Sequence, residues 1–143
     1  MTTNTYHLTY TDNQPNDYSI NQGVDYTFTI QYPADITLWV PTGTIRRNWA
    51  DNDTTQHLAL FNFQTPIYDS ITGLTTILPY LTAEQTSLIP HTLTRANSKV
   101  PAVPGSNVWV YDIDIVSLSG QSHRLVGGYV EVRPGVTLYP VNP

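Results

Sequence analysis

The chain has 143 residues, enough for a single domain with its own hydrophobic core, and the absence of cysteine excludes disulfides and thiolate metal sites. Its formal net charge of −5 does not suit a surface that binds nucleic-acid phosphates, so we expect no nucleic-acid partner. The apolar runs are far shorter than a membrane span and no signal peptide is visible, so we also expect no membrane partner.

Alternating apolar and polar residues predict β-strands through the first half of the chain. A short strand pattern covers residues 5–10, where Tyr6, Leu8 and Tyr10 alternate with Thr and His. The alternation is clearest over residues 24–32, where every second residue is aliphatic or aromatic. Further strands are expected at 36–40 and 43–47 across a Pro-Thr-Gly turn, and then at 57–63 and 74–78, the last after a turn at 72–73.

One short helix is predicted near 82–88. Thr82 and Gln85, three residues apart, form the pattern of a capping box, and Pro90 ends the run. The next residues, 91–106, contain prolines and a glycine and are expected to form an extended loop. A loop of this length in a compact domain is usually functional or bound to a partner.

The last part of the chain predicts a β-hairpin over residues 107–132, with a turn in the segment SLSGQS. In its first strand Trp109, Tyr111, Ile113 and Ile115 share one face, and the opposite face holds Asp112 and Asp114. The predicted core comprises Phe28, Ile30, Trp109, Tyr111, Ile113, Leu125 and Val130. The many short strands predict one antiparallel β-sandwich over residues 20–143, preceded by an N-terminal arm, residues 1–19.

Few residues suggest chemistry. Asp112 and Asp114 point to one side of a strand and could bind a cation, but we favour a solvated or partner-facing strand. The histidines at positions 7, 57, 91 and 123 are scattered, without the spacing of zinc ligands. Ser119-Gly120 fits a hairpin turn better than a nucleophile. We therefore expect no catalytic residue, no cofactor and no metal, and a protein that is not an enzyme.

Two further patterns each have two interpretations. The adjacent pair Arg46 and Arg47 faces an acidic neighbour or is a solvated strand end. The second pattern is the aromatic content, which includes ten tyrosines and three tryptophans, Trp39, Trp49 and Trp109. These side chains could stack on sugars, or they could fill a small β core and its interfaces. We favour the second interpretation.

Three segments resemble a group of small tailed-phage virion proteins that are similar to the Ig-like N-terminal domain of phage baseplate upper proteins. The segments are INQGVDYTFTI at 20–30, LTAEQTSLIP at 81–90 and the closing hairpin at 109–137, in that order. The resemblance implies an Ig-like sandwich and a structural, non-enzymatic role. The expected function is a tail or baseplate adaptor or wedge in the virion, made in the host bacterial cytoplasm. A capsid decoration, cement or neck protein is an alternative, and a receptor- or carbohydrate-binding domain is an alternative from another class.

The expected partners are other virion proteins, in tail, baseplate or capsid, within a homo- or hetero-oligomeric assembly. The arm 1–19 and the loop 91–106 are too polar to build a core of their own, so we expect partners to order them. The candidate contact residues are Tyr6, Leu8, Tyr10, Arg46, Arg47, Leu93 and Val100.

Overall fold

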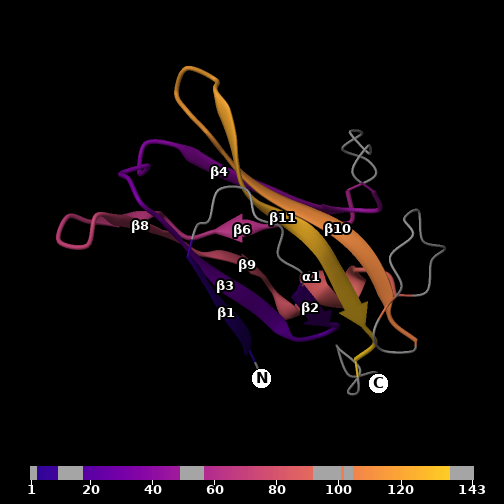
Figure 1. The fold of residues 1–143 in the computed structure, drawn as a ribbon. Coiled ribbons are helices and arrows are strands. Elements are labelled where there is room, and N and C mark those ends of the chain that lie inside the picture. Colours follow the sequence, from indigo (N-terminus) through magenta and orange to yellow (C-terminus); the bar gives the residue numbers. More distant parts are fainter. Residues whose placement is uncertain (1–2, 10–17, 49–56, 92–100, 102–104, 136–143) are drawn as a thin grey trace.

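The computed structural model describes residues 3–9, 18–48, 57–91, 101 and 105–135, with backbone alone for residues 3–9. As predicted, this is an all-β fold in which two sheets pack as a sandwich and one short helix lies at its side (Figure 1). Antiparallel pairs dominate both sheets, and two edge pairs are parallel. No helix in the described part of the chain is long and apolar enough to cross a membrane.

The first sheet is built around β3, the strand with the clearest alternation in the sequence. Its members are β1 (Thr3–Thr9), β3 (Asp25–Tyr32), β6 (Asn62–Phe63), β7 (Ile67–Asp69), β8 (Leu74–Ile77) and β9 (Pro79–Leu81). On one edge β3 pairs in parallel with β1; β8 and β9 pair antiparallel with β3 one after the other in the same register. They therefore act as a single strand interrupted at Leu78.

The second sheet is built around the closing hairpin. Its order is β2 (Tyr18–Asn21), β11 (Ser122–Arg133), β10 (Asn107–Val116), β4 (Val40–Arg46) and β5 (Ala59–Leu60). The turn between β10 and β11 closes with Ser117 N–H donating to Gln121 O at 2.8 Å, and Gly120 adopts a φ of 91°. That conformation favours glycine, so the turn interpretation of Ser119-Gly120 is confirmed.

The core lies between the inner faces of the two sheets. All seven predicted core residues are buried, none more than 2% exposed. Trp109 is fully buried, and its indole Nε1–H donates to the Pro90 carbonyl at 2.7 Å, which satisfies its polar atom. The aromatic rings of Tyr18, Phe28 and Phe61 pack close together, with centroids 5.1 Å apart for Tyr18–Phe28 and 6.1 Å for Phe28–Phe61.

The predicted helix is confirmed as α1 (Ala83–Leu88). Thr82 is its N-cap, and both hydrogen bonds of the capping box with Gln85 are present. Asp25 Oδ1 accepts from Ala83 N–H at 2.8 Å, and Thr86 Oγ1 donates to Val24 O at 2.9 Å. These contacts fix the helix to the start of β3, because they satisfy polar groups that the short helix leaves unpaired.

The expectation of two strands across a Pro-Thr-Gly turn at 41–43 is wrong. β4 runs straight through this tripeptide, and the turn lies earlier, where Asp35 Oδ1 accepts from Thr37 N–H at 3.1 Å. Gly43 lies opposite Ile113 in the sheet, and a Cβ added there would approach Ile113 Cδ1 to 2.6 Å. The glycine is needed for close packing inside a strand rather than for a turn.

The single strand expected over 57–63 is also wrong, because this segment crosses from one sheet to the other. Phe61 N–H donates to Gly43 O at 2.9 Å in the second sheet, and the next residue, Asn62, pairs with Tyr80 in the first. Phe61 itself is buried between the sheets. Since both sheets alternate with the same period, the sequence pattern alone could not reveal the crossing.

The two polar segments fall partly within the described residues. From the arm 1–19, β1 pairs with β3, and β2 begins at Tyr18 and pairs in parallel with β11. From the loop 91–106, His91 Nδ1 lies 3.0 Å from Gly105 O, so a hydrogen bond joins the two ends of the segment.

Candidate functional site

Three neighbouring strands place polar side chains on the outer face of the second sheet. In β4 the residues that alternate with Gly43 and Ile45 are Thr42, Thr44 and Arg46. In β10, Asp112 and Asp114 alternate with the buried Ile113. The period of two in each strand therefore brings hydroxyl, guanidinium and carboxylate groups together on this face.

A β-bulge completes this group of side chains. The register between β10 and β11 shifts between Ile113 and Asp114, so that Asp114 lies opposite Arg124 rather than Leu125. Leu125 and its neighbour Val126 are both buried. One extra residue in β11 thus keeps two apolar side chains in the core and turns Arg124 toward the carboxylates.

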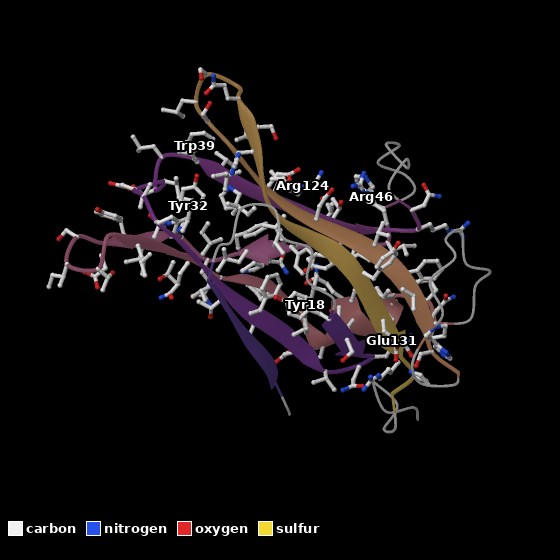
Figure 2. The ribbon with its side chains drawn as sticks, viewed as in Figure 1. Tyr18, Tyr32, Trp39, Arg46, Arg124 and Glu131 are labelled. Carbon is white, nitrogen blue, oxygen red and sulfur yellow. The ribbon has the colours of Figure 1, made fainter. Side chains whose placement is uncertain are left out.

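The charged side chains form a continuous chain of ion pairs. Arg46 pairs with Asp112 through Nη2 and Oδ2, and Arg124 bridges the two carboxylates. Its Nη2 lies 3.1 Å from Asp112 Oδ2 and its Nε lies 2.6 Å from Asp114 Oδ1. Arg46 and Asp112 are buried, whereas the Arg124 side chain is 43% exposed. Figure 2 labels Arg46 and Arg124 on the second sheet.

Burial changes the acidity of Asp112. The pKa of its carboxyl lies above the ordinary value because removal from water disfavours the charged form. Arg46 and Arg124 lower the pKa and the nearby Asp114 raises it, and the cost of burial outweighs the attraction of the two guanidinium groups. The ion pairs therefore offset only part of the cost of burying this carboxylate and do not give a net gain in stability.

A shallow pocket of about 330 Å³ opens over these residues. It is lined by Thr42, Gly43, Thr44, Arg46, His57, Asp112, Asp114 and Arg124. The charges are already paired with one another, so the pocket offers hydrogen-bond donors and acceptors to a neutral polar group rather than a free charge. Among the described residues, no three His, Cys, Asp or Glu side chains lie close enough to hold a metal ion.

A second surface lies at one end of the sandwich, which we call the hairpin end (residues 33–40, 67–74 and 116–122). Here β3 finishes beside the start of β8, and β4 begins beside the last residue of β10. The hairpins β7–β8 and β10–β11 project from this end (Figure 1). An edge-to-face contact between the rings of Tyr32 and His123, with centroids 6.2 Å apart, connects the two sheets there.

Most of the exposed large apolar side chains belong to the three segments of the hairpin end. The described residues include eight large apolar side chains that are exposed, and Leu60 and Leu88 alone lie elsewhere. The other six are Leu38, Val40, Ile67, Tyr68, Ile71 and Leu118. Ile71 and Leu118 occupy the tips of the two hairpins and are 93% and 82% exposed. Single exposed apolar residues are ordinary, but a concentration at one end is typical of a contact surface.

The seven candidate contact residues are not brought together in the described structure. Arg46 is buried against Asp112, so it is not a solvated strand end, and the acidic group that it faces belongs to its own chain. Arg47 follows it and is half-buried. Tyr6 and Leu8 occupy the register positions of Phe28 and Ile30 in the β1–β3 pair. The other three, Tyr10, Leu93 and Val100, lie outside the described residues.

Other residues singled out in the sequence have structural surroundings. The Asp112 side chain is buried, which corrects the expectation of a solvated or partner-facing strand at that position. Trp109 belongs to the core, and Trp39 is half-buried and packs against it. Trp49 lies outside the described residues. Arg124 and the apolar residues at the hairpin tips were not identified from the sequence. The tips could have been found, because Leu118 and Ile71 are large apolar residues two positions before a turn glycine.

Comparisons with known proteins give no family. No family model matches the chain, and no curated protein matches it. Among solved structures, the bradyzoite-specific antigen BSR4 from Toxoplasma gondii aligns with a TM-score of 0.34 and 9% sequence identity. The alignment covers 96% of this chain and 51% of that one, so the chain spans about half the length of the antigen structure. A likeness at this level supports no conclusion about function.

Proposed function

We propose that this chain is a structural component of a tailed-phage virion, a tail or baseplate adaptor that works through protein–protein contacts made by its hairpin end. The observation that supports contact through this end is that its three segments contain six of the eight exposed large apolar side chains among the described residues. The virion setting is supported by the three segments that resemble small phage virion proteins.

The hairpin end has the properties of a preorganised contact surface. In the β10–β11 turn, Gly120 N–H donates to Ser117 O at 3.0 Å and Ser117 Oγ accepts from Gln121 N–H at 3.0 Å. Leu118 is therefore held on a defined turn, and its ordering costs little on binding. Burial of one such leucine or isoleucine contributes about 1.5–3 kcal/mol, so a few of them suffice as the main contacts of an interface.

The polar pocket favours a second candidate function, a carbohydrate-binding β domain. Sugar hydroxyl groups both donate and accept hydrogen bonds, and the pocket presents paired Arg and Asp side chains beside two threonine hydroxyls. Trp39 and Trp109 do not line this pocket, so the aromatic stacking expected of most sugar sites is not provided by them.

The test uses two leucines with the same exposure. Leu38 at the hairpin end and Leu88 on α1 are both 73% exposed, so Leu38→Asp and Leu88→Asp differ in location but not in burial. Each variant, with Leu118→Asp as a second hairpin-end change, is introduced into the phage genome that encodes the chain. The amount of the chain in gradient-purified particles is then measured by mass spectrometry.

We expect the unmodified chain and the Leu88→Asp chain in the particles, and at least tenfold less of the two hairpin-end variants. A tenfold loss corresponds to about 1.4 kcal/mol of binding free energy. Absence of the unmodified chain from particles would overturn the virion proposal. Normal incorporation of both hairpin-end variants would overturn the contact surface.

A further inference from the structure

Within the part of the chain that the structure describes, the N-terminal strand β1 pairs with one strand only. It pairs in parallel with β3 at seven successive positions, from Thr3 opposite Asp25 to Thr9 opposite Gln31. It lies at an edge of the first sheet, and the chain then continues into β2, which belongs to the second sheet. We propose that β1 is an exchangeable strand, which pairs with β3 of a second copy of this chain when copies assemble.

The edge of β3 that β1 covers needs a partner strand. Tyr26, Phe28 and Ile30 of β3 are essentially fully buried, so this strand is central to the core. Without β1, one edge of β3 would present a row of unpaired backbone N–H and C=O groups. A second copy supplies a strand of identical sequence, which can form the same seven pairs. Exchange therefore conserves every backbone pair of the edge.

The connection between β1 and β3 does not enforce pairing within one chain. Strands of a β-hairpin are joined by a few residues and stay together, but here residues 10–24 intervene, including β2 in the other sheet. The segment between β1 and β2 is YTDNQPND, residues 10–17, which contains a proline and few apolar residues. Fully extended, eight residues span at most about 28 Å, which sets the greatest separation of β1 from β2 of the same chain in an exchanged pair.

Local concentration decides whether β1 pairs with β3 of its own chain (the closed form) or with β3 of a second copy (the exchanged form). A short tether holds β1 near its own β3 at an effective concentration of about millimolar. Copies that are packed side by side in an assembly present a neighbouring β3 at a similar local concentration, so the position of the neighbour selects the pairing. Strand exchange requires an assembly of this chain but does not require that the assembly be a virion. A result that contradicts strand exchange therefore leaves the virion proposal untouched, and the reverse also holds.

The absence of native cysteine permits a direct test. His7 and Thr29 are register partners in the β1–β3 pair, and the Thr29 side chain is half-buried. Chains with His7→Cys alone are mixed with chains with Thr29→Cys alone at millimolar concentration and oxidised. A disulfide between positions 7 and 29 can then form only between two chains. The matched control mixes His7→Cys with Ser119→Cys, which lies on the exposed β10–β11 turn.

We expect the 7–29 disulfide to exceed the 7–119 disulfide at least tenfold, measured by peptide mass spectrometry. Equal yields of the two disulfides would overturn the proposal. A third sample keeps the test interpretable: a chain with both His7→Cys and Thr29→Cys, oxidised when dilute, should give a cross-linked monomer. If the double variant closes as a monomer and the mixture gives only background, β1 stays in its own chain and no exchange occurs.

Discussion

Replacement of Arg46 by Met tests the account of the buried ion pair. Methionine retains an unbranched apolar side chain in the space of the arginine stem but removes the guanidinium group. The Arg46 and Asp112 side chains are only 10% and 8% exposed, so the change leaves a carboxylate in a place that water hardly reaches. The matched control is Arg124→Met, because Arg124 contacts the same carboxylate but its side chain is 43% exposed.

The expected magnitude follows from burial. Removal of one partner from a buried ion pair costs about 3–5 kcal/mol of unfolding free energy. The value should fall near the lower end, about 3 kcal/mol, because Arg124 remains 3.1 Å from Asp112. The exposed pair between Arg124 and Asp114 contributes far less, so Arg124→Met should cost about 1 kcal/mol or less.

The cost of Arg46→Met should depend on pH in a defined direction. Burial already raises the pKa of Asp112 above its ordinary value of 3.8, and loss of Arg46 removes an influence that lowers it. The folded state of the variant therefore holds this proton more tightly than the unfolded chain does. The contribution of this carboxyl to the free energy of unfolding is therefore greatest below pH 3.8 and is lost as the pH rises through the raised folded pKa. The deficit relative to the unmodified protein should be largest at neutral pH and shrink in acid.

Denaturant unfolding at a series of pH values measures both variants. The double variant Arg46→Met with Asp112→Asn removes the buried charge and should recover much of the loss at pH 7. The reasoning fails if Arg46→Met costs no more than Arg124→Met at pH 7. It fails equally if the deficit of Arg46→Met grows as the pH is lowered.

Two core substitutions give further predictions. Trp109→Ala should lower the free energy of unfolding by about 3–5 kcal/mol, because it empties a fully buried site; a loss below about 1 kcal/mol in denaturant unfolding would contradict that role. Gly43→Ala should cost about 1–3 kcal/mol, because its Cβ would lie 2.6 Å from Ile113 Cδ1, and adding Ile113→Val, which removes that carbon, should restore part of it. If the same measurement finds the Gly43→Ala protein as stable as the original, then β4 can move away from Ile113 at no cost in free energy, and the close-packing argument is wrong.

Features encoded by neighbouring residues were predictable from the sequence. The alternation in β3, the capping box of Thr82 and Gln85, and the turn at Gly120 each depend on residues a few positions apart. Gly43 was misread because proline and glycine within three residues are typical of a turn. Its actual role depends on Ile113, 70 positions along the chain, which packs against it.

The candidate site required knowledge of strand order. Arg46 and Asp112 meet because β4 is the neighbour of β10, and no local pattern reveals that pairing. Arg124 reaches the same carboxylate only through the bulge before Asp114, which shifts the register by one residue. Strand alternation predicts which residues share a face of one strand, but not which strands lie side by side.

The crossing of residues 59–63 between the sheets has a consequence for how this sandwich unfolds. Two sheets joined only by loops can separate with their backbone pairs intact, whereas here Phe61 N–H and Asn62 belong to opposite sheets and are adjacent in the chain. Gln85 Nε2 also donates to Leu60 O at 3.0 Å, which ties the helix to the same point. Separation of the two layers must break the backbone hydrogen bonds of this short segment. We therefore expect both layers and the helix to unfold as a single cooperative unit. Their slowest amides should exchange at the same free energy as global unfolding.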